Sequence, residues 1–476
     1  MLLRGKRRLA IVVTSALTMA GLWGAAAGAQ ALPPAGQVSF SEPTLSPSFA
    51  PDIEDYVVRC QNAPVTVQGH ASAGWQMAIG NHPFRSGDFS ETVSLGSGRA
   101  FVVTARQGGP PLYRYHVRCL PNSFPTYAYT RSGPVSPQYF AVTRNDLRYA
   151  IIFNNHGVPI WWVHTLTWNA RVLPSGDVLW FNPPPGQFEI HRLNGGLVRV
   201  LRPVGLPSDG HDLRFASNGD HLVASGILQD HVDTTAYGGS SDATVKQAEL
   251  QEVSPSGQLV WDWKTQDHIS LAETGRWWPS AVGFGYDLVH WNSIQPAGNG
   301  SVIASFRHLD AVYKIDKSTG AIVWKLGGTS RPASLNVIGD PLAYTFGGQH
   351  DARLLPDGTV TVFDNRTDLN SPPRAVRFRI DETAGTATLL QSISDPDVPL
   401  SGCCGSARRL GNGDWLIDWG QAQNHPIGGY EANGDRTFLL TLDGRSSYRA
   451  EPVPSGAVSA QSLRQAMNAR CSSGCF

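Results

Sequence analysis

From about Ala150 onward the chain consists of short apolar segments in pairs, and each pair is joined by a turn that contains glycine. Apolar and polar residues alternate within these segments, which predicts β-strands, and the turns predict hairpins. Six of the hairpins have a second strand in which apolar residues recur: AIIFNNHGVPIWWV, FEIHRLNGGLVRVL, LQEVSPSGQLVWDW, YKIDKSTGAIVWKL, RFRIDETAGTATLL and FLLTLDGRSSYRAEPV.

A second kind of hairpin alternates with the first. Its five copies are NARVLPSGDVLWF, HDLRFASNGDHLVAS, HWNSIQPAGNGSVIASF, HDARLLPDGTVTVFDN and SARRLGNGDWLIDWG. Hairpins that alternate in this way, at spacings of about 40 to 80 residues, predict a β-propeller with four strands in each blade. We expect six blades, with the segment YFAVTRNDL before Ala150 closing the ring, and seven blades as the alternative. Loops inserted near residues 230–247 and 265–289 account for the longer spacings.

The segment before the repeats has the same strand pattern but no repeat. Residues 33–120 carry alternating strands separated by Gly, Ser and Pro, which is typical of a β-sandwich. We therefore expect an all-β protein in which a small N-terminal β-sandwich precedes a six-bladed β-propeller. The expected domains are the sandwich at 33–120, a Pro-rich linker at 121–140, the propeller at 141–454 and a Cys-containing C-terminal tail at 455–476.

Residues 1–31 have the pattern of a signal peptide. The basic start MLLRGKRR is followed by a long apolar run, and AGAQA, which ends at Ala31, offers a cleavage site between small residues. We expect a secreted or otherwise extracytoplasmic protein that has no membrane segment after cleavage. The apolar run is about 20 residues long, so an uncleaved membrane anchor is the alternative.

The charge balance narrows the classes of partner. Basic and acidic residues are equal at 38 each, and cleavage after Ala31 leaves 34 basic against 38 acidic residues. A slightly acidic chain argues against binding to nucleic acids or to anionic membrane surfaces. The phosphate-binding G-x-x-x-x-G-K-[ST] loop, the G-x-S-x-G elbow and the H-E-x-x-H zinc motif do not occur in the sequence.

Six cysteines in an exported chain predict disulfides. Cys60 and Cys119 end the similar strands YVVRC and YHVRC, and we expect them to pair. The other four, Cys403, Cys404, Cys471 and Cys475, form either two bridges between the tail and the adjacent pair, or a local Cys471–Cys475 loop and a Cys403–Cys404 bridge. An oxidising compartment favours disulfides over metal binding at these four residues, and we expect no metal and no cofactor.

Three histidines occupy the same place in three of the repeats. When the second hairpins are aligned on their turns, His211, His290 and His350 each open the first strand. Trp168 and Gly405 take this place in the other two copies. Equivalent positions in successive blades lie at the same height, so the three imidazoles are expected to meet at the mouth of the central channel. The alternative is that they fix turns, together with the aspartates that follow His211 and His350.

Arg307 ends the strand that follows the turn after His290. A guanidinium in an apolar barrel needs an anionic ligand or a carboxylate partner, for which Asp310 and Asp351 are the candidates. Three histidines suit zinc or copper, but a neutral imidazole is also a nucleophile and a proton carrier. With a cation beside it, such a site suits transfer of a sulfuryl or phosphoryl group.

Several phrases of the sequence resemble the arylsulfotransferase family, in its bacterial type that does not use PAPS. They are H-x-N-S at His290, S-x-R-H before the strand YKID, W-x-L-G-G, and Q-H-D-A at His350, within a similarity that spans about residues 140–450. The resemblance implies a six-bladed propeller with its site in the central channel. It also implies ping-pong transfer of a sulfuryl group from an aryl sulfate to a phenol through a sulfohistidine.

The resemblance also implies roles for single residues. His350 is similar to the family's nucleophile, His290 and Arg307 to the residues that hold the sulfuryl oxygens and assist proton transfer, and His211 to the remaining active-site histidine. Asn292 is expected to help orient the substrate. The Cys403–Cys404 pair has no counterpart in the family's site, and the aromatic candidates for stacking a phenol are Trp168, Trp277, Trp278 and Tyr286.

Two other functions remain open at this point. One is a propeller that binds a metal through its histidines and acts as a lyase or an oxidoreductase. The other is a secreted binding module without catalysis, in which the histidines only fix turns.

Overall fold

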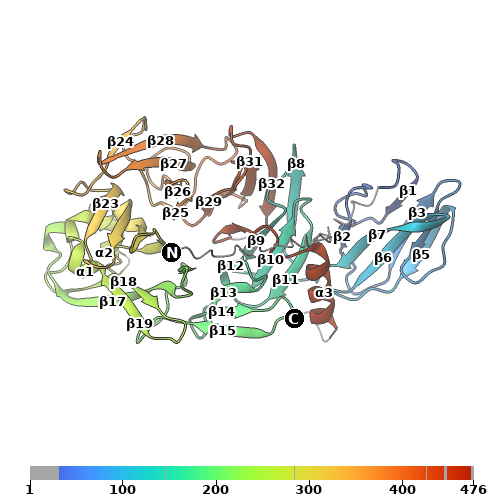
Figure 1. Ribbon diagram of the computed structural model, residues 1–476, viewed down its shortest axis with the longest axis horizontal. Coiled ribbons are helices and arrows are strands. Elements are labelled where there is room, and N and C mark those ends of the chain that lie inside the picture. Colours follow the sequence, from blue (N-terminus) through green and yellow to red (C-terminus); the bar gives the residue numbers. More distant parts are fainter. Residues whose placement is uncertain (1–31, 145, 284, 425, 444–446, 473–476) are drawn as a thin grey trace, which may run out of the picture.

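A computed structural model describes residues 32–144, 146–283, 285–424, 426–443 and 447–472 of the chain. Strands are the main secondary structure of these residues, and the helices are few and short (Figure 1). The expected all-β class is confirmed. The expected signal segment, residues 1–31, and Cys475 lie outside the described residues.

Two sheets form the N-terminal part and share one apolar core. The core contains Tyr56, Trp75 and Tyr115, and the expected disulfide between Cys60 and Cys119 is present within it. One sheet has the order β1 (Val38–Ser41), β3 (Val65–Ala71), β5 (Gly87–Val93), and the other has the order β2 (Asp55–Val58), β7 (Gly109–Cys119), β6 (Ala100–Gln107), β4 (Gln76–Ile79).

The rest of the described chain forms six sheets of four or five strands, which follow one another around a ring (Figure 1). Nearly all neighbouring strands in these sheets are antiparallel, as hairpins require. The first two sheets have the orders β11 (Pro159–His164), β10 (Tyr149–Asn154), β9 (Tyr139–Arg144), β33 (Ala450–Pro452), and β12 (Trp168–Val172), β13 (Val178–Asn182), β14 (Gln187–His191), β15 (Leu197–Leu201). The third and fourth have the orders β16 (Leu213–Phe215), β17 (His221–Val232), β18 (Ala243–Val253), β19 (Leu259–Lys264), and β20 (Trp291–Pro296), β21 (Ser301–Phe306), β22 (Ala311–Asp316), β23 (Ile322–Gly327). The fifth and sixth have the orders β24 (Asn336–Ile338), β28 (Thr386–Ile393), β27 (Arg374–Asp381), β26 (Thr359–Asp364), β25 (His350–Leu354), and β29 (Ser406–Arg409), β30 (Trp415–Asp418), β31 (Pro426–Tyr430), β32 (Arg436–Leu442), β8 (Tyr127–Arg131).

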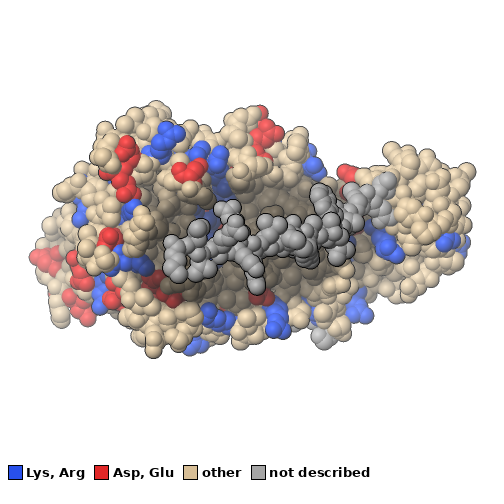
Figure 2. Space-filling view, in the orientation of Figure 1, with Lys and Arg blue, Asp and Glu red and all other residues tan. Residues whose placement is uncertain are grey.

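The inner strands of the six sheets lie side by side around the axis of the ring. β16 lies beside β20, β20 beside β25, β25 beside β29, β29 beside β33, and β33 beside β12. The sheets are packed face to face through apolar side chains, so strands such as β10 and β21 are buried along their whole length. Each apolar side chain removed from water in this way contributes about 1.5–3 kcal/mol to stability. On the face that Figure 2 shows, the middle of the ring is hollowed.

Two long-range pairings close the ring, and they differ from the expected hairpins. The repeat FLLTLDGRSSYRAEPV is not a hairpin: its first half is β32, and its second half contains β33, which pairs with β9 in another sheet. The expected linker contains β8, which pairs with β32. The segment YFAVTRNDL closes the ring as expected, because β9 joins β33 to β10. Unpaired strand edges are costly, and these pairings remove them.

The helical segments cover the ring at two places. Between β19 and β20, where an inserted loop was expected, lie α1 (Thr265–His268), the 3₁₀ segment η2 (Leu271–Trp277) and α2 (Trp278–Gly283). The segments η1 (Thr235–Tyr237) and η3 (Arg307–Leu309) are single turns. The helix α3 (Ala460–Cys471) lies in the expected tail, between the N-terminal sheets and β11 (Figure 1). No helix in the described ranges is long and apolar enough to cross a bilayer.

Candidate active site

The three histidines predicted from the repeats come together at the start of the inner strands. His350 opens β25, and His211 and His290 lie just before β16 and β20. The ring centroids of His211 and His290 are 5.3 Å apart, and the ring of Tyr448 lies 5.6 Å from His211 and 6.5 Å from His350. A fourth histidine, His308, extends the group at 4.7 Å from His290.

The imidazole of His350 is fixed by hydrogen bonds on both ring nitrogens. Nδ1 lies 2.7 Å from Oδ1 of Asn365 and 3.0 Å from the carbonyl oxygen of Gly348. A carbonyl oxygen can only accept, so Nδ1 carries the proton. Nε2 accepts a hydrogen bond of 3.3 Å from the backbone N–H of Cys404. His350 is 1% exposed, and burial, followed by the Arg307 cation, holds its pKa well below 6.5. The side chain is therefore a neutral imidazole with its lone pair on Nε2.

The residues before His350 explain why a strand opens with so polar a sequence. Gly348 has a φ of 65°, and a Cβ atom there would lie 3.0 Å from Oγ1 of Thr367, so glycine lets the chain turn in a tight space. The side-chain Nε2 of Gln349 donates to Oγ of Ser305 and to the carbonyls of Phe306 and Ala311, each at 2.9 or 3.0 Å. These bonds tie the start of β25 to the neighbouring sheet and hold His350 in place.

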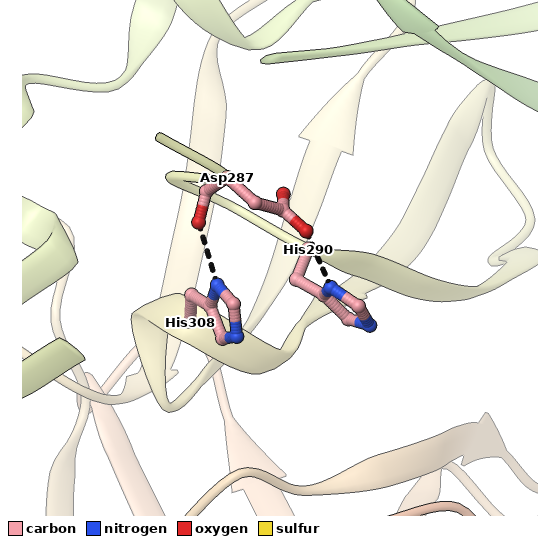
Figure 3. Close-up of side chains that lie close together, drawn as sticks. All are labelled: Asp287, His290 and His308. Carbon is pink, nitrogen blue, oxygen red and sulfur yellow. Dashed lines mark hydrogen bonds and ion pairs between the residues drawn. The ribbon is translucent and has the colours of Figure 1, made fainter. Parts of the chain in front are cut away.

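Asp287 holds both His290 and His308 (Figure 3). Its carboxylate lies 2.7 Å from Nδ1 of His290, and its backbone carbonyl oxygen lies 2.6 Å from Nδ1 of His308. Both rings thus present Nε2 on the side away from Asp287. Burial lowers the pKa of both histidines, that of His308 to about 3, so both are neutral at pH 7.

His211 has the same arrangement as His290. Its Nδ1 forms a short contact with the carboxylate of Asp209, which also accepts a 2.9 Å hydrogen bond from the His211 backbone N–H. The carbonyl of His211 accepts a 2.8 Å hydrogen bond from Nδ2 of Asn169 on the neighbouring inner strand. In all four histidines, therefore, Nδ1 is held by a hydrogen bond. Nε2 accepts from the backbone N–H of Cys404 in His350, and in the other three it makes no hydrogen bond to a described residue.

Arg307 lies beside this group without a carboxylate partner in the described part of the chain. Its guanidinium lies 4.3 Å from the ring centroid of Trp277 and donates a 3.1 Å hydrogen bond to the carbonyl of Gly402. Burial lowers its pKa to about 10, so it is a cation at pH 7. Its Nε is buried and has no hydrogen-bond partner among the described residues. An unpaired, largely desolvated guanidinium is suited to binding an anion.

Both candidates for a carboxylate partner of Arg307 are engaged elsewhere, which favours the other alternative, an anionic ligand. Asp310 pairs with Arg276 at 2.6 Å and accepts from the indole N–H of Trp277 and the N–H of Gly348. Asp351 lies in a buried network along the axis of the ring, which we name the central charge cluster. Its members are Arg171, Arg214, Arg353, Arg408, Arg449, Asp212, Asp351 and Glu451.

The loop 401–405 completes the site and contains the second disulfide, Cys403–Cys404. Its backbone contacts both His350 and Arg307, through Cys404 and Gly402. The side chain of Asn365 donates to the carbonyl of Cys404 at 3.0 Å and to Oγ of Ser401 at 2.9 Å. Because Nδ2 of Asn365 makes both of these bonds, its Oδ1 faces His350. Of the two arrangements expected for the four remaining cysteines, this disulfide favours the one with a local Cys403–Cys404 bridge.

Asn292 lies near the site but does not face an open space. It is fully buried, and its Nδ2 donates a 2.8 Å hydrogen bond to the carbonyl of Gln349, next to His350. It thus positions the start of β25. Among the aromatic candidates, Trp277 forms a wall of the site by stacking on His308 at 4.8 Å. Trp278 stacks on Tyr237, the hydroxyl of Tyr286 accepts a 3.1 Å hydrogen bond from the backbone N–H of Ser240, and Trp168 packs near Phe181.

The residues that the sequence reasoning missed are those that hold the histidines. Asp209 and Asp287 precede His211 and His290 by two and three residues, so a short-range search for carboxylates would have found them. Asn365 directly follows β26, the strand that pairs with β25, and Tyr448 lies just before β33. His308 directly follows Arg307 in the phrase S-x-R-H.

One group of side chains has a geometry suited to a metal ion. The ligand atoms of Asp287, His290 and His308 lie within 4.8 Å of one another. Metal-binding histidines usually donate their other ring N–H to a carboxylate or carbonyl, as these two do. The carboxylate, however, is already bonded to His290, and the Arg307 cation lies nearby, which disfavours a divalent cation.

Comparisons with known proteins place the chain in a family. The solved structures that are similar to this chain are only weakly so. The streptogramin B lyase structure has 9% identity and a TM-score of 0.35 and covers 67% of this chain and 98% of its own, and virginiamycin B lyase from Staphylococcus aureus has 10% identity and a TM-score of 0.36 and covers 67% of this chain and 99% of its own. The Cps50 (Swd1) β-propeller domain of Myceliophteria thermophila has 13% identity and a TM-score of 0.36 and covers 66% of this chain and 88% of its own. Similarity at this level carries no conclusion about this chain. No curated protein matched the chain.

Residues 205–440, which include all four histidines and Arg307, match the model of the family described as arylsulfotransferase (ASST). The chain therefore belongs to the arylsulfotransferase family.

Proposed function

We propose that the protein is an extracytoplasmic sulfotransferase that moves a sulfuryl group from an aryl sulfate ester to a phenol by a ping-pong mechanism, with His350 as the nucleophile. Its six ring sheets are, in this proposal, the blades of a six-bladed propeller, and the two N-terminal sheets are a β-sandwich. Family membership supports the reaction class, and the disulfides are in keeping with export.

The observation that carries this proposal is the fixed tautomer of His350. Two acceptors on Nδ1 keep the lone pair on Nε2, and the lowered pKa keeps the ring unprotonated at pH 7. A neutral imidazole held in one orientation is ready to attack without losing a proton first.

In the first half-reaction, Nε2 of His350 attacks the sulfur of the aryl sulfate. The N–S bond forms, and the bond between sulfur and the aryl oxygen breaks with its electron pair leaving on the phenolate. The sulfohistidine ring still holds its proton on Nδ1 and so carries a positive charge. Asn365 and Gly348 accept from that N–H and stabilise this charge. In the second half-reaction, the oxygen of an acceptor phenol attacks sulfur, the N–S bond breaks, and neutral His350 is restored.

Arg307 and the N–H of Cys404 are the donors available to the sulfuryl oxygens. The amide of Cys404 points at Nε2 of His350, which is where the sulfuryl group would be bound. The Arg307 guanidinium has an unpartnered Nε and no ion pair in the described chain. Donors fixed in place before the reaction stabilise the charge that develops on equatorial oxygens.

His290 and His211 are the proton carriers in this proposal. Each holds its Nδ1 on a carboxylate, Asp287 or Asp209, which stabilises the imidazolium that forms when Nε2 takes a proton. One of them accepts the proton of the acceptor phenol in the second half-reaction. The same proton is returned to the phenolate that leaves in the next first half-reaction.

The proposal is tested by intact mass spectrometry after brief incubation with a chromogenic aryl sulfate and no acceptor. We expect a burst of phenol and a gain of one sulfuryl group on the wild-type chain, both lost in His350→Ala. Arg307→Gln should still fold and should lower kcat by about 10²–10³-fold, the usual effect of losing one such donor.

The matched control is His70→Ala, in an N-terminal sheet, which should label and turn over as the wild type does. Full turnover by His350→Ala, or labelling of a residue other than His350, would refute the proposed nucleophile. Transfer without any covalent sulfuryl group would refute the ping-pong scheme.

A second candidate, a metal-dependent lyase or oxidoreductase, is favoured only by the grouping of Asp287, His290 and His308. Elemental analysis of the purified protein separates the two. Stoichiometric zinc or copper, with activity that chelators remove and the metal restores, would support the metal site. Sulfuryl transfer that is unchanged by chelators would exclude a metal requirement for that reaction.

A further inference from the structure

A cavity of about 500 Å³ lies at the opposite end of the inner strands from the histidines. His350 opens β25, whereas the cavity is lined by the residues where the inner strands end, such as Leu354. Four arginines contribute to its wall: Arg214, Arg353, Arg408 and Arg409. Its size is within the range of small-molecule sites.

The charges next to this cavity do not balance. The central charge cluster contains five arginines and three carboxylates, and three of the five arginines also line the cavity. The nearby Asp418 is buried, and burial raises its pKa to about 7, so it offsets at most one of the two excess charges. Every Asp and Glu of the chain lies within the described residues, so no other acidic side chain is left to restore the balance.

A buried excess of positive charge is costly unless an anion compensates it. The cost is visible in two members of the cluster, because burial lowers the pKa of both Arg171 and Arg408 to about 9. Neither has been neutralised at pH 7, so the excess charge persists under ordinary conditions.

Several donors at the cavity wall have no partner in the described chain. Nε of Arg408 and Nε of Arg409 are buried without a hydrogen bond, as is Oγ1 of Thr361. Arg409 also makes no ion pair with any described residue. Arg408, by contrast, uses only Nη2 in its bonds to Asp351 and Glu451. The cavity is thus lined by guanidinium donors that are free to bind a ligand.

We propose that this arginine-lined cavity binds a small organic polyanion, one that carries at least two carboxylate or phosphate groups. Guanidinium groups pair with such oxyanions in bidentate fashion, and several of them around one space suit a ligand with several charges. The site is separate from the histidine site and does not depend on the proposed sulfuryl transfer.

The test uses citrate as the probe, titrated into the full chain in a calorimeter, with sodium chloride at matched ionic strength as the blank. Arg307→Gln serves as the background, because the Arg307 guanidinium is the proposed anion-binding group of the histidine site and would add a second site for citrate. We expect one citrate to bind in this background. Arg409→Gln should weaken citrate binding about tenfold or more, the effect of losing charge-assisted hydrogen bonds.

Ser217→Glu is a second variant that does not touch the buried cluster. Ser217 is exposed on the cavity wall, so a carboxylate there should repel citrate and abolish binding without harming the fold. Arg379→Gln, which removes an exposed arginine of β27, is the control and should leave citrate binding unchanged. The proposal is overturned if citrate does not bind, if it binds equally to Arg409→Gln and Ser217→Glu, or if Arg307→Gln alone abolishes binding.

Discussion

His350 is held by groups that come from three separate stretches of the chain. Gly348 precedes it, Asn365 directly follows the paired strand β26, and Cys404 lies in the loop before the next inner strand. Each contact acts on a different atom of the imidazole or its environment: two fix the proton on Nδ1, and one meets the lone pair on Nε2. The reactivity of this side chain is thus set by its neighbours, because a free histidine has no preferred orientation and is partly protonated near pH 6.5.

Asp351, next to His350, belongs to the packing of the ring. It has a φ of 60° and accepts from Nε of Arg353 at 3.0 Å, while Arg408 and Arg449 lie at 2.8 and 3.5 Å. Asp212, which follows His211, pairs with Arg353 in the same cluster at 2.7 Å. In each His-Asp pair, therefore, the imidazole lies at the histidine site and the carboxylate lies in the central charge cluster.

The buried histidines predict how stability depends on pH. Burial, followed by repulsion from His290, lowers the pKa of His308 to about 3, whereas the same residue titrates near 6.5 in the unfolded chain. Between these two pH values the unfolded chain binds a proton that the native protein does not. The free energy of unfolding therefore falls as pH decreases through this window, by up to about 1.4 kcal/mol per pH unit for this one residue.

Urea denaturation at a series of pH values below 6.5 checks this prediction. We expect the free energy of unfolding of His308→Gln to depend less steeply on pH than that of the wild type. His231→Gln, which changes a histidine whose side chain is 86% exposed, is the control and should keep the wild-type slope. An unchanged slope in His308→Gln would show that His308 is protonated as readily in the native state as in the unfolded one.

At the scale of elements, the loop 401–405 is the part of the site that the family phrases did not include. Gly420 packs against it so closely that a Cβ atom there would lie 2.2 Å from the carbonyl oxygen of Cys403. With the disulfide on one side and Asn365 on the other, the loop has little freedom to move the Cys404 N–H or the Gly402 carbonyl.

The double variant Cys403→Ser/Cys404→Ser should therefore lower kcat about tenfold or more, since a fixed donor at a transferring group is worth 10²–10³-fold when it is lost completely. KM should change less, because Arg307 still binds the anion. Steady-state kinetics with an aryl sulfate measure both constants, given that the proposed activity is present in the wild type.

Treatment with dithiothreitol separates this disulfide from the N-terminal one. The wild type should lose activity to the level of the double variant, whereas the variant should not respond to the reagent. Cys60–Cys119 is present in both proteins. An equal loss in both would assign the effect to a disulfide outside the loop, such as this one, and contradict the role of the loop.

The strands themselves were predictable, because alternation of apolar and polar residues is a local signal. β22 and β23, for example, correspond to YKIDKSTGAIVWKL. The segment YFAVTRNDL was expected to close the ring, but the partners of the closing strands were not predictable, because β8 with β32 and β9 with β33 join residues roughly 300 apart in the sequence. Nothing in a local pattern states which distant strand will cover an open edge.

The site was likewise predictable only in part: its histidines and Arg307 could be predicted from the sequence, but the groups that hold His350 could not. The repeat placed His211, His290 and His350 at equivalent positions, and the family phrases added Arg307. Asn365 was not predicted, because its contact with His350 follows from the pairing of β25 with β26 and from no motif. The neutral state of the buried histidines could not be read from the sequence either, since it depends on how completely each ring is removed from water.

At the scale of the whole molecule, α3 joins the N-terminal sheets to the ring. Its apolar face, with Leu463 and Met467, packs on the core that contains Trp162. From its other face Arg464 reaches Asp55 at the start of β2. Asn468 accepts a 2.8 Å hydrogen bond from Arg118 on β7. The C-terminal helix thus connects parts of the chain that are about 400 residues apart in the sequence.

The Arg464 contacts predict that this connection depends on one side chain. Both Nε and Nη2 of Arg464 bond to the Asp55 carboxylate at 2.7 Å, and Nη2 also lies 2.9 Å from Glu54. Hydrogen bonds to charged groups contribute about 1.5–3 kcal/mol each when they are partly buried.

Arg464→Ala should therefore loosen the N-terminal sheets from the ring, which limited proteolysis would detect as faster cleavage between β7 and β8. Sulfotransferase activity should be retained, because none of these contacts involves the histidine site. Arg192→Ala, at an exposed position of the ring, is the control. Cleavage rates that are equal in both variants would mean that the other contacts of α3 with the N-terminal sheets, such as Asn468 with Arg118, are sufficient to hold the two parts together.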